Sequence, residues 1–233
     1  SWNTSLAYQF IDYNDGLLML LGNRQPDGAY FSASGSPWGN GGVPGMGNLI
    51  LATNNLESRS HSLLLGADKP YTEASPWSVN LAYTYIAAEQ NVHEQNPAYG
   101  WFFPAGGSFG GAWTPRHRLV VSGFGDIGHG MSLSGKLTLA SHLRRWGTDD
   151  SSGYEAIRSF QPEGNIGFKQ FDLSLAKTWD TGSDVKLKVR ADVLNVFDWQ
   201  NWGGYGKNWD TGAINQWDQY TTRTFKLSFG LDW

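Results

Sequence analysis

The sequence predicts an all-β fold of antiparallel strands, and three observations support this prediction. About eight stretches, each roughly nine to fourteen residues long, alternate between apolar and polar side chains, which is the period of a β-strand. The connections between these stretches are alternately long and short. The composition of 30 Gly, 12 Trp, 10 Tyr and 12 Phe in 233 residues favours strands and turns over helices.

The clearest stretch is 185–197. Every second residue from Val185 to Val193 is apolar, and the residues between them are charged. Successive side chains of a strand point to opposite faces, so this strand has one apolar face and one charged face. The charged face carries Lys186, Lys188, Arg190 and Asp192.

The other strands follow from the same alternation. In the first half of the chain it predicts strands at 2–10, 58–67, 77–85 and 116–125, and residues 17–21 extend the first strand past the bend at 14–16. In the second half it predicts strands at 131–143, 168–179, 185–197 and 220–233. Each of these strands has one predominantly apolar face, although the alternation is weaker over 116–125.

The connections indicate what covers the apolar faces. The long connections are 22–57, 88–115, 144–166 and 198–219, and the short ones are 68–76, 126–130 and 180–183. Long loops at one end, short turns at the other and aromatic residues at strand ends are typical of a transmembrane β-barrel. In lipid no backbone polar group can remain unpaired, so such a sheet has to close. The predicted fold class is therefore an antiparallel transmembrane β-barrel, with long loops outside the cell and short turns in the periplasm.

Composition and motifs exclude several other functions. The net charge of −4 argues against a nucleic-acid binder, and the absence of Cys excludes disulfides and thiolate metal sites. No run of apolar residues is long enough for a transmembrane helix. The five His are not at metal-ligand spacing, and no motif joins a Ser nucleophile to a His base. We therefore expect no catalytic residue, no metal and no cofactor.

Four stretches resemble a known family. The stretch from Val185 to Asp198, ending Asn-Val-Phe-Asp, resembles the penultimate strand of TonB-dependent outer-membrane receptors. The last nine residues, which end in Trp233, resemble the terminal strand of outer-membrane barrels, whose final aromatic residue is a signal to the barrel assembly machinery. Trp77-Ser-Val-Asn-Leu-Ala-Tyr-Thr-Tyr85 and Pro115-Arg-His-Arg-Leu-Val-Val121 resemble earlier strands of the same C-terminal region.

This resemblance implies a function and a set of partners. Family members carry a plug domain and a TonB-contacting segment, followed by a barrel of about 22 strands. We therefore expect residues 1–233 to be the C-terminal part of such a barrel, as a fragment or as one chain of a split receptor, without the plug. The implied function is TonB-dependent uptake of a siderophore, an oligosaccharide or a peptide across the outer membrane of a Gram-negative bacterium. The implied partners are outer-membrane lipid and lipopolysaccharide, the rest of the barrel, the plug, TonB and the assembly machinery.

Two other hypotheses remain open from the sequence. A complete eight-stranded barrel with a structural or adhesive role has a closed size whose interior is filled by side chains. An outer-membrane enzyme is the third hypothesis, and it has the least support.

The candidate site residues form two groups, and each has a structural interpretation as well as a functional one. Lys186, Lys188, Arg190 and Asp192 would line the lumen, where they attract an anionic solute, contact a plug or simply form charge pairs. The loop aromatics would stack on sugars or flat ligands, or would serve as interfacial belt and loop packing. These aromatics are Trp101, Phe102, Trp199, Trp202, Trp209 and Trp217. On the opposite face, Val185, Leu187, Val189 and Val193 are predicted to touch lipid.

Overall fold

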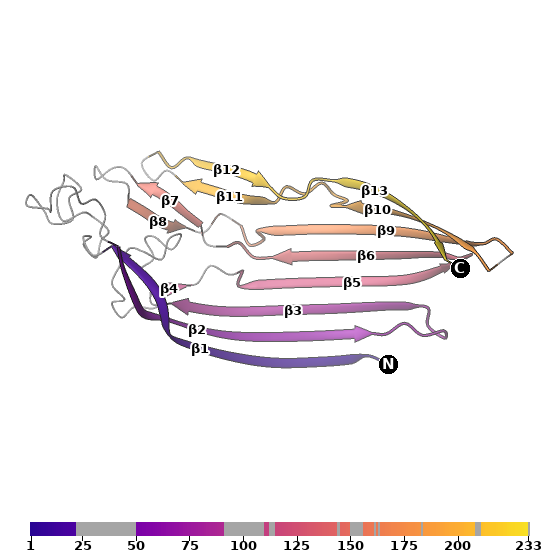
Figure 1. Ribbon diagram of the computed structural model, residues 1–233, viewed down its shortest axis with the longest axis horizontal. Coiled ribbons are helices and arrows are strands. Elements are labelled where there is room, and N and C mark those ends of the chain that lie inside the picture. The colour runs from indigo at the N-terminus through magenta and orange to yellow at the C-terminus, as the bar shows by residue number, and fades with distance from the viewer. Residues whose placement is uncertain are drawn as a thin grey trace, which may run out of the picture.

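One long antiparallel sheet contains most of the described chain (Figure 1). The computed structural model describes residues 1–21, 50–90, 110–111, 115–143, 145–149, 156–160, 162, 164–182, 184–207 and 211–232. Within these ranges the elements are all strands. The sheet has the order β1 (Asn3–Leu21), β2 (Ile50–Lys69), β3 (Trp77–Gln90), β5 (His117–Gly128), β6 (Met131–Ala140), β9 (Phe168–Asp180), β10 (Lys186–Leu194) and β13 (Thr224–Asp232).

Short turns and long connections lie at opposite ends of this sheet (Figure 1). The turns after β2, β5 and β9 lie at one end, with the start of β1 and the end of β13. The tightest turn, between β5 and β6, places His129 at a φ of 55° between Gly128 and Gly130 at 85° and 70°. These left-handed conformations suit glycine, which has no Cβ to clash. The predicted alternation of long and short connections is confirmed.

The predicted extension of the first strand past the bend at 14–16 is confirmed, since β1 is one strand whose register with β2 shifts around Gly16. Several other predicted boundaries were wrong. Because β1 continues to Leu21, β2 pairs with it from Ile50 and not from residue 58. Sheet pairing also ends β6 at Ala140 and β10 at Leu194, earlier than predicted, and starts β13 only at Thr224.

Two predicted loops contain short hairpins. The connection 144–166 holds β7 (Arg145–Asp149) paired with β8 (Ala156–Phe160). The connection 198–219 holds β11 (Trp202–Lys207) and β12 (Ile214–Gln219), which also pair. The two-residue strand β4 (Gly110–Gly111) pairs with the end of β3. These strands of two to six residues are too short for an alternation that the sequence could reveal.

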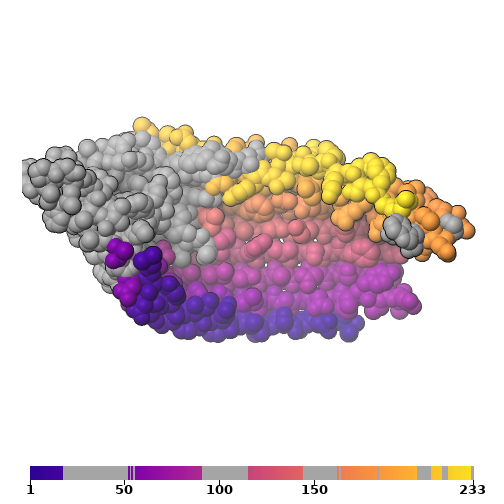
Figure 2. All heavy atoms as spheres, viewed as in Figure 1, coloured from indigo at the N-terminus to yellow at the C-terminus, as the bar shows by residue number. Residues whose placement is uncertain are grey.

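The register separates the sheet into a polar and an apolar face. One row that crosses six strands is polar throughout: Asn3, Asp68, Asn80, Ser122, Lys136 and Asp172. A row on the other face is apolar apart from the tyrosine hydroxyl: Leu6, Leu65, Tyr83, Leu119 and Leu139. Figure 2 shows the strands side by side from the indigo N-terminal edge to the yellow C-terminal edge. The sheet therefore has no second layer of strands covering its apolar face in the described ranges.

The two edges of the sheet are open within the described residues. There β1 pairs only with β2 and β13 only with β10. Their apolar side chains include the most exposed of the large hydrophobic side chains in the described ranges, with Phe225 at 73%, Phe229 at 71% and Leu6 at 69%. None of the described elements is a helix long and apolar enough to cross a membrane.

Candidate functional site on the polar face

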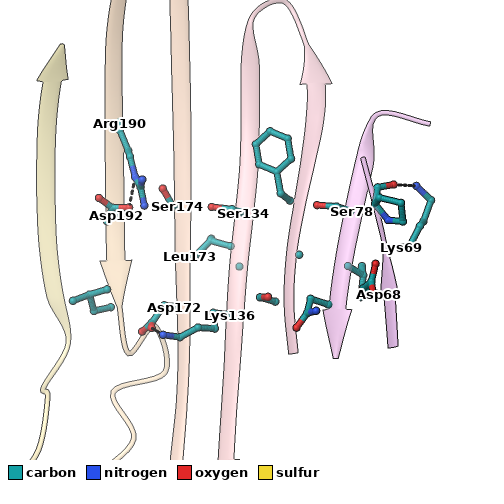
Figure 3. A pocket seen from close by; sticks show the side chains of 18 residues that line it. Asp68, Lys69, Ser78, Ser134, Lys136, Asp172, Leu173, Ser174, Arg190 and Asp192 are labelled. Carbon is teal, nitrogen blue, oxygen red and sulfur yellow. Dashed lines mark hydrogen bonds and ion pairs between the residues drawn. The ribbon is translucent and has the colours of Figure 1, made fainter. Parts of the chain in front are cut away.

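The polar face is hollowed into a groove of about 660 Å³ that extends from β2 to β10 (Figure 3). Its lining includes Ser78 and Ser134, which lie in one cross-strand row with Phe124, Ser174, Asp192 and Lys226. At the turn end, the Tyr71 ring lies 5.8 Å from the Phe124 ring. The groove therefore contains a row of polar side chains, with one aromatic contact at its turn end.

Most charges of the groove have a partner of opposite sign. Arg190 Nε lies 2.7 Å from Asp192 Oδ1, and Lys136 Nζ lies 3.9 Å from Asp172 Oδ2 (Figure 3). Ser174 also donates a hydrogen bond to the Asp192 carboxylate. Of the predicted row of cations, Arg190 is therefore paired within β10, and the groove also contains a pair between β6 and β9.

All four predicted lumen residues lie on this polar face. Lys186 lies in register between Asp180 on β9 and Asp232 on β13, so it has acidic neighbours on both sides. Lys188 instead lies between Thr178 and Gly230. Among the described residues it makes no ion pair. Lys186 makes no ion pair there either, so attraction of an anion by this row would depend on these two lysines.

The corner after β10 is built around Asn195, whose side chain is fully buried. Its Nδ2 donates to Trp199 O at 2.9 Å and to Thr221 O at 3.0 Å, and its Oδ1 accepts from Trp199 N at 3.0 Å. Its backbone N–H donates to Asp172 Oδ1 at 3.0 Å. The Asn195 side chain thus joins the end of β10 to the segment that enters β13, and its backbone N–H joins the same corner to β9.

Asn201 continues the hydrogen bonding of β9 beyond the end of β10. Its Nδ2 donates to Lys169 O and its Oδ1 accepts from Lys169 N, both at 2.8 Å. These two hydrogen bonds are of the kind that a neighbouring strand would make with Lys169. The side chain is 1% exposed, so both of its polar groups need these partners. Asn195 and Asn201 do not stand out in the sequence as structural residues, because an asparagine in a loop ordinarily indicates a turn.

The structure separates the predicted loop aromatics. The Trp199 ring lies 4.8 Å from the Phe197 ring, which stacks on Phe171 of the apolar face at 5.6 Å. Trp202 instead lines a second cavity at the loop end of the polar face. Trp217 lies opposite Gly204 in the β11–β12 hairpin, and its side chain is outside the described part. Trp101, Phe102, Trp209 and the predicted assembly signal Trp233 also lie outside the described residues.

Lysine–tryptophan pairs mark both ends of the apolar face. At the turn end, Lys69 Nζ lies 4.0 Å from the Trp77 ring and Lys177 Nζ lies 5.6 Å from the Trp179 ring. At the loop end, Lys169 Nζ lies 5.6 Å from the Trp199 ring. On β9, the residues between the two lysines on this face are Phe171, Leu173 and Leu175. The apolar band therefore has a defined upper and lower limit.

The chain was compared with known proteins. No protein-family model matches it, and no curated protein matches it. Among solved structures it is similar to the outer membrane transporter YddB from Escherichia coli, with a TM-score of 0.56 and 12% sequence identity. The match covers 99% of this chain and 30% of the transporter chain, so this chain spans less than a third of that protein. The likeness is one of fold, and with the all-β sheet of eight long antiparallel strands it confirms the predicted fold class.

Proposed function

We propose that this chain forms part of the wall of an outer-membrane transport barrel of a Gram-negative bacterium. The apolar face contacts lipid, and the polar face lines the interior. The observation that carries the proposal is the apolar band between lysine–tryptophan pairs. Tryptophan prefers the membrane–water interface, and lysine extends its ammonium group out of the hydrocarbon.

The height of this band suits a bilayer. Lys169 and Lys177 are eight residues apart on one strand, which corresponds to roughly 26 Å along the strand. The apolar band of outer-membrane barrels is about 25 Å tall. Strand tilt shortens the projected height, and the extended lysine side chains compensate for part of that loss.

The open edges support a barrel larger than these eight strands. Unpaired backbone groups of β1 and β13 would be costly in lipid, so further strands have to pair with them. This requirement favours a wall segment over a small closed barrel, in which β1 would pair with β13. The further strands, a plug and TonB are accordingly the partners we propose, and the solute is a siderophore, an oligosaccharide or a peptide. The similarity to a transporter of which this chain spans 30% is consistent with this proposal.

The membrane arrangement can be tested on two adjacent residues of β6. Because the chain contains no Cys, Leu133→Cys and Ser134→Cys each give a single labelling position. In the intact protein in phosphatidylcholine vesicles, a polarity-sensitive fluorophore at position 133 should be quenched by brominated lipid. The same fluorophore at position 134 should be quenched by aqueous iodide instead. Equal lipid quenching at both positions, or the reverse assignment, would refute the proposed faces.

A further inference from the structure

A second cavity, of about 300 Å³, lies on the polar face nearer to the loop end than the groove. Lys136 and Asp172 line the groove, and Thr138 and Ala140, the next residues of β6 on the same face, line the second cavity. Two residues of a strand span about 7 Å, so the two hollows follow one another along β6. A solute that enters from the loop end would meet this cavity before the groove.

Three aromatic residues from different segments contribute to the wall of the cavity: Phe168, Trp202 and Tyr220. The Phe168 and Tyr220 rings meet edge to face at 6.2 Å. Buried Asn201 holds all three in place, since it precedes Trp202, bonds both backbone groups of Lys169, and accepts from Tyr220 N at 2.8 Å through its own carbonyl. The fold therefore fixes the positions of these aromatic residues in the cavity wall.

The basic residues Arg118 and His142 also line the cavity, and no Asp or Glu does. Arg118 lies in register between Thr84 on β3 and Ala140 on β6, and within the described ranges it makes no ion pair. Gly167 allows His142 to pack closely, because a Cβ at this position would lie 2.6 Å from His142 Cα. In contrast with the groove, where most charges are paired, this cavity presents the guanidinium group of Arg118, and no Asp or Glu lines it.

From this combination we infer that the cavity binds an aromatic carboxylate. The guanidinium group of Arg118 matches the two oxygens of a carboxylate, and the aromatic wall matches a flat ring. The volume lies at the lower end of the range for ligand pockets, which suits one or two rings. This inference rests on the proposed function in one respect, namely that the polar face is the solute-accessible interior.

Binding can be measured with 2-naphthoate as the probe and the intact protein in phosphatidylcholine nanodiscs. We expect saturable binding in isothermal titration calorimetry and weaker binding by about tenfold or more for 2-naphthamide, which has the same rings without the charge. Arg118→Gln should weaken naphthoate binding to a similar extent. Lys226→Gln, which removes a cation of β13 on the same face and outside both linings, should leave binding unchanged.

Three outcomes would overturn the inference. They are no naphthoate binding, equal binding by Arg118→Gln, and tighter binding of glucuronate, which would make the cavity a sugar-acid site. Arg118→Lys is a second variant that retains the charge but loses the planar fork, and an affinity between those of wild type and Arg118→Gln supports bidentate recognition. The quenching experiment on β6 is independent of naphthoate, so a failure of this inference is distinguishable from a failure of the proposed wall.

Discussion

At the scale of single residues, two lysines near the ends of β9 mark the limits of the strand's apolar face. Lys169 and Lys177 share that face with Phe171, Leu173 and Leu175, and both lie near tryptophan rings. They occupy this face only at the two positions where a membrane–water interface would cross the strand. Leu173 lies midway between them, whereas Leu187 lies opposite Trp179 near the turn end.

The loss in free energy of unfolding caused by an introduced charge should therefore increase with the depth of that charge in the membrane. Leu173→Arg places a guanidinium group at the centre of the apolar band and should lower the free energy of unfolding by about 2 to 4 kcal/mol. Leu187→Arg should cost less because its side chain can reach the interface. The measurement is urea unfolding of the protein in phosphatidylcholine vesicles.

Lys188→Leu is the matched control, since it makes the adjacent position of β10 apolar on the polar face. We expect a small effect on the free energy of unfolding. If Lys188→Leu were as harmful as Leu173→Arg, or if Leu187→Arg cost more than Leu173→Arg, the proposed faces and membrane depth would be wrong.

At the scale of elements, the corner between β10 and β13 depends on one side chain. Asn195 adopts a φ of 50° and makes three side-chain hydrogen bonds to backbone groups. Asparagine tolerates this left-handed conformation better than most residues do. A second contact, from Arg223 N to Asp198 Oδ1 at 3.0 Å, holds the segment that leads into β13.

Asn195→Ala should lower the free energy of unfolding by at least about 2 kcal/mol, because it leaves buried backbone groups without partners. Asn195→Gly removes the same hydrogen bonds but relieves the backbone strain, so it should be less harmful than the alanine variant. Urea unfolding in vesicles measures both variants. Asn80→Ala, at an exposed asparagine, is the control and should change little.

A similar free energy of unfolding for Asn195→Ala and Asn80→Ala would show that the buried hydrogen bonds do not stabilise the corner. Greater harm from glycine than from alanine would show that the left-handed backbone does not contribute strain at this position.

At the scale of the whole molecule, the open edges are the main feature. β1 and β13 each carry a row of backbone groups without a strand partner in the described residues, beside strongly exposed apolar side chains. A sheet edge of this length is a template for further pairing. In a membrane the pairing becomes a requirement, because lipid offers no hydrogen bonds.

The native protein, purified from outer membranes, should accordingly contain more than this chain's sequence. Intact-mass analysis should find further barrel strands and a plug, in the same polypeptide or in a co-purifying one. The isolated periplasmic domain of TonB should then capture the assembly. A particle with the mass of 233 residues alone that resists heat and protease as a closed barrel would refute the wall segment in favour of the small barrel.

The sequence by itself determined the strands of the sheet and their two faces. A period of two is a local property, and it identified all eight long strands and the apolar row from Leu6 to Leu139. The spacing between the strands also predicted the order of long and short connections, which lie at opposite ends of the sheet. For a charged residue in the middle of a clear alternation, such as Lys188, the same pattern also predicted the face of the sheet on which it lies.

Only the tertiary structure decided which groups meet across strands. The pairing of Lys136 with Asp172, the hydrogen bonds of Asn201 to Lys169, and the separation of Trp199 from Trp202 depend on register and on the path of the corner. These contacts join residues up to 36 positions apart in the sequence (136 and 172). A local pattern contains no information about such distances, because register is set by the whole set of paired strands and their turns.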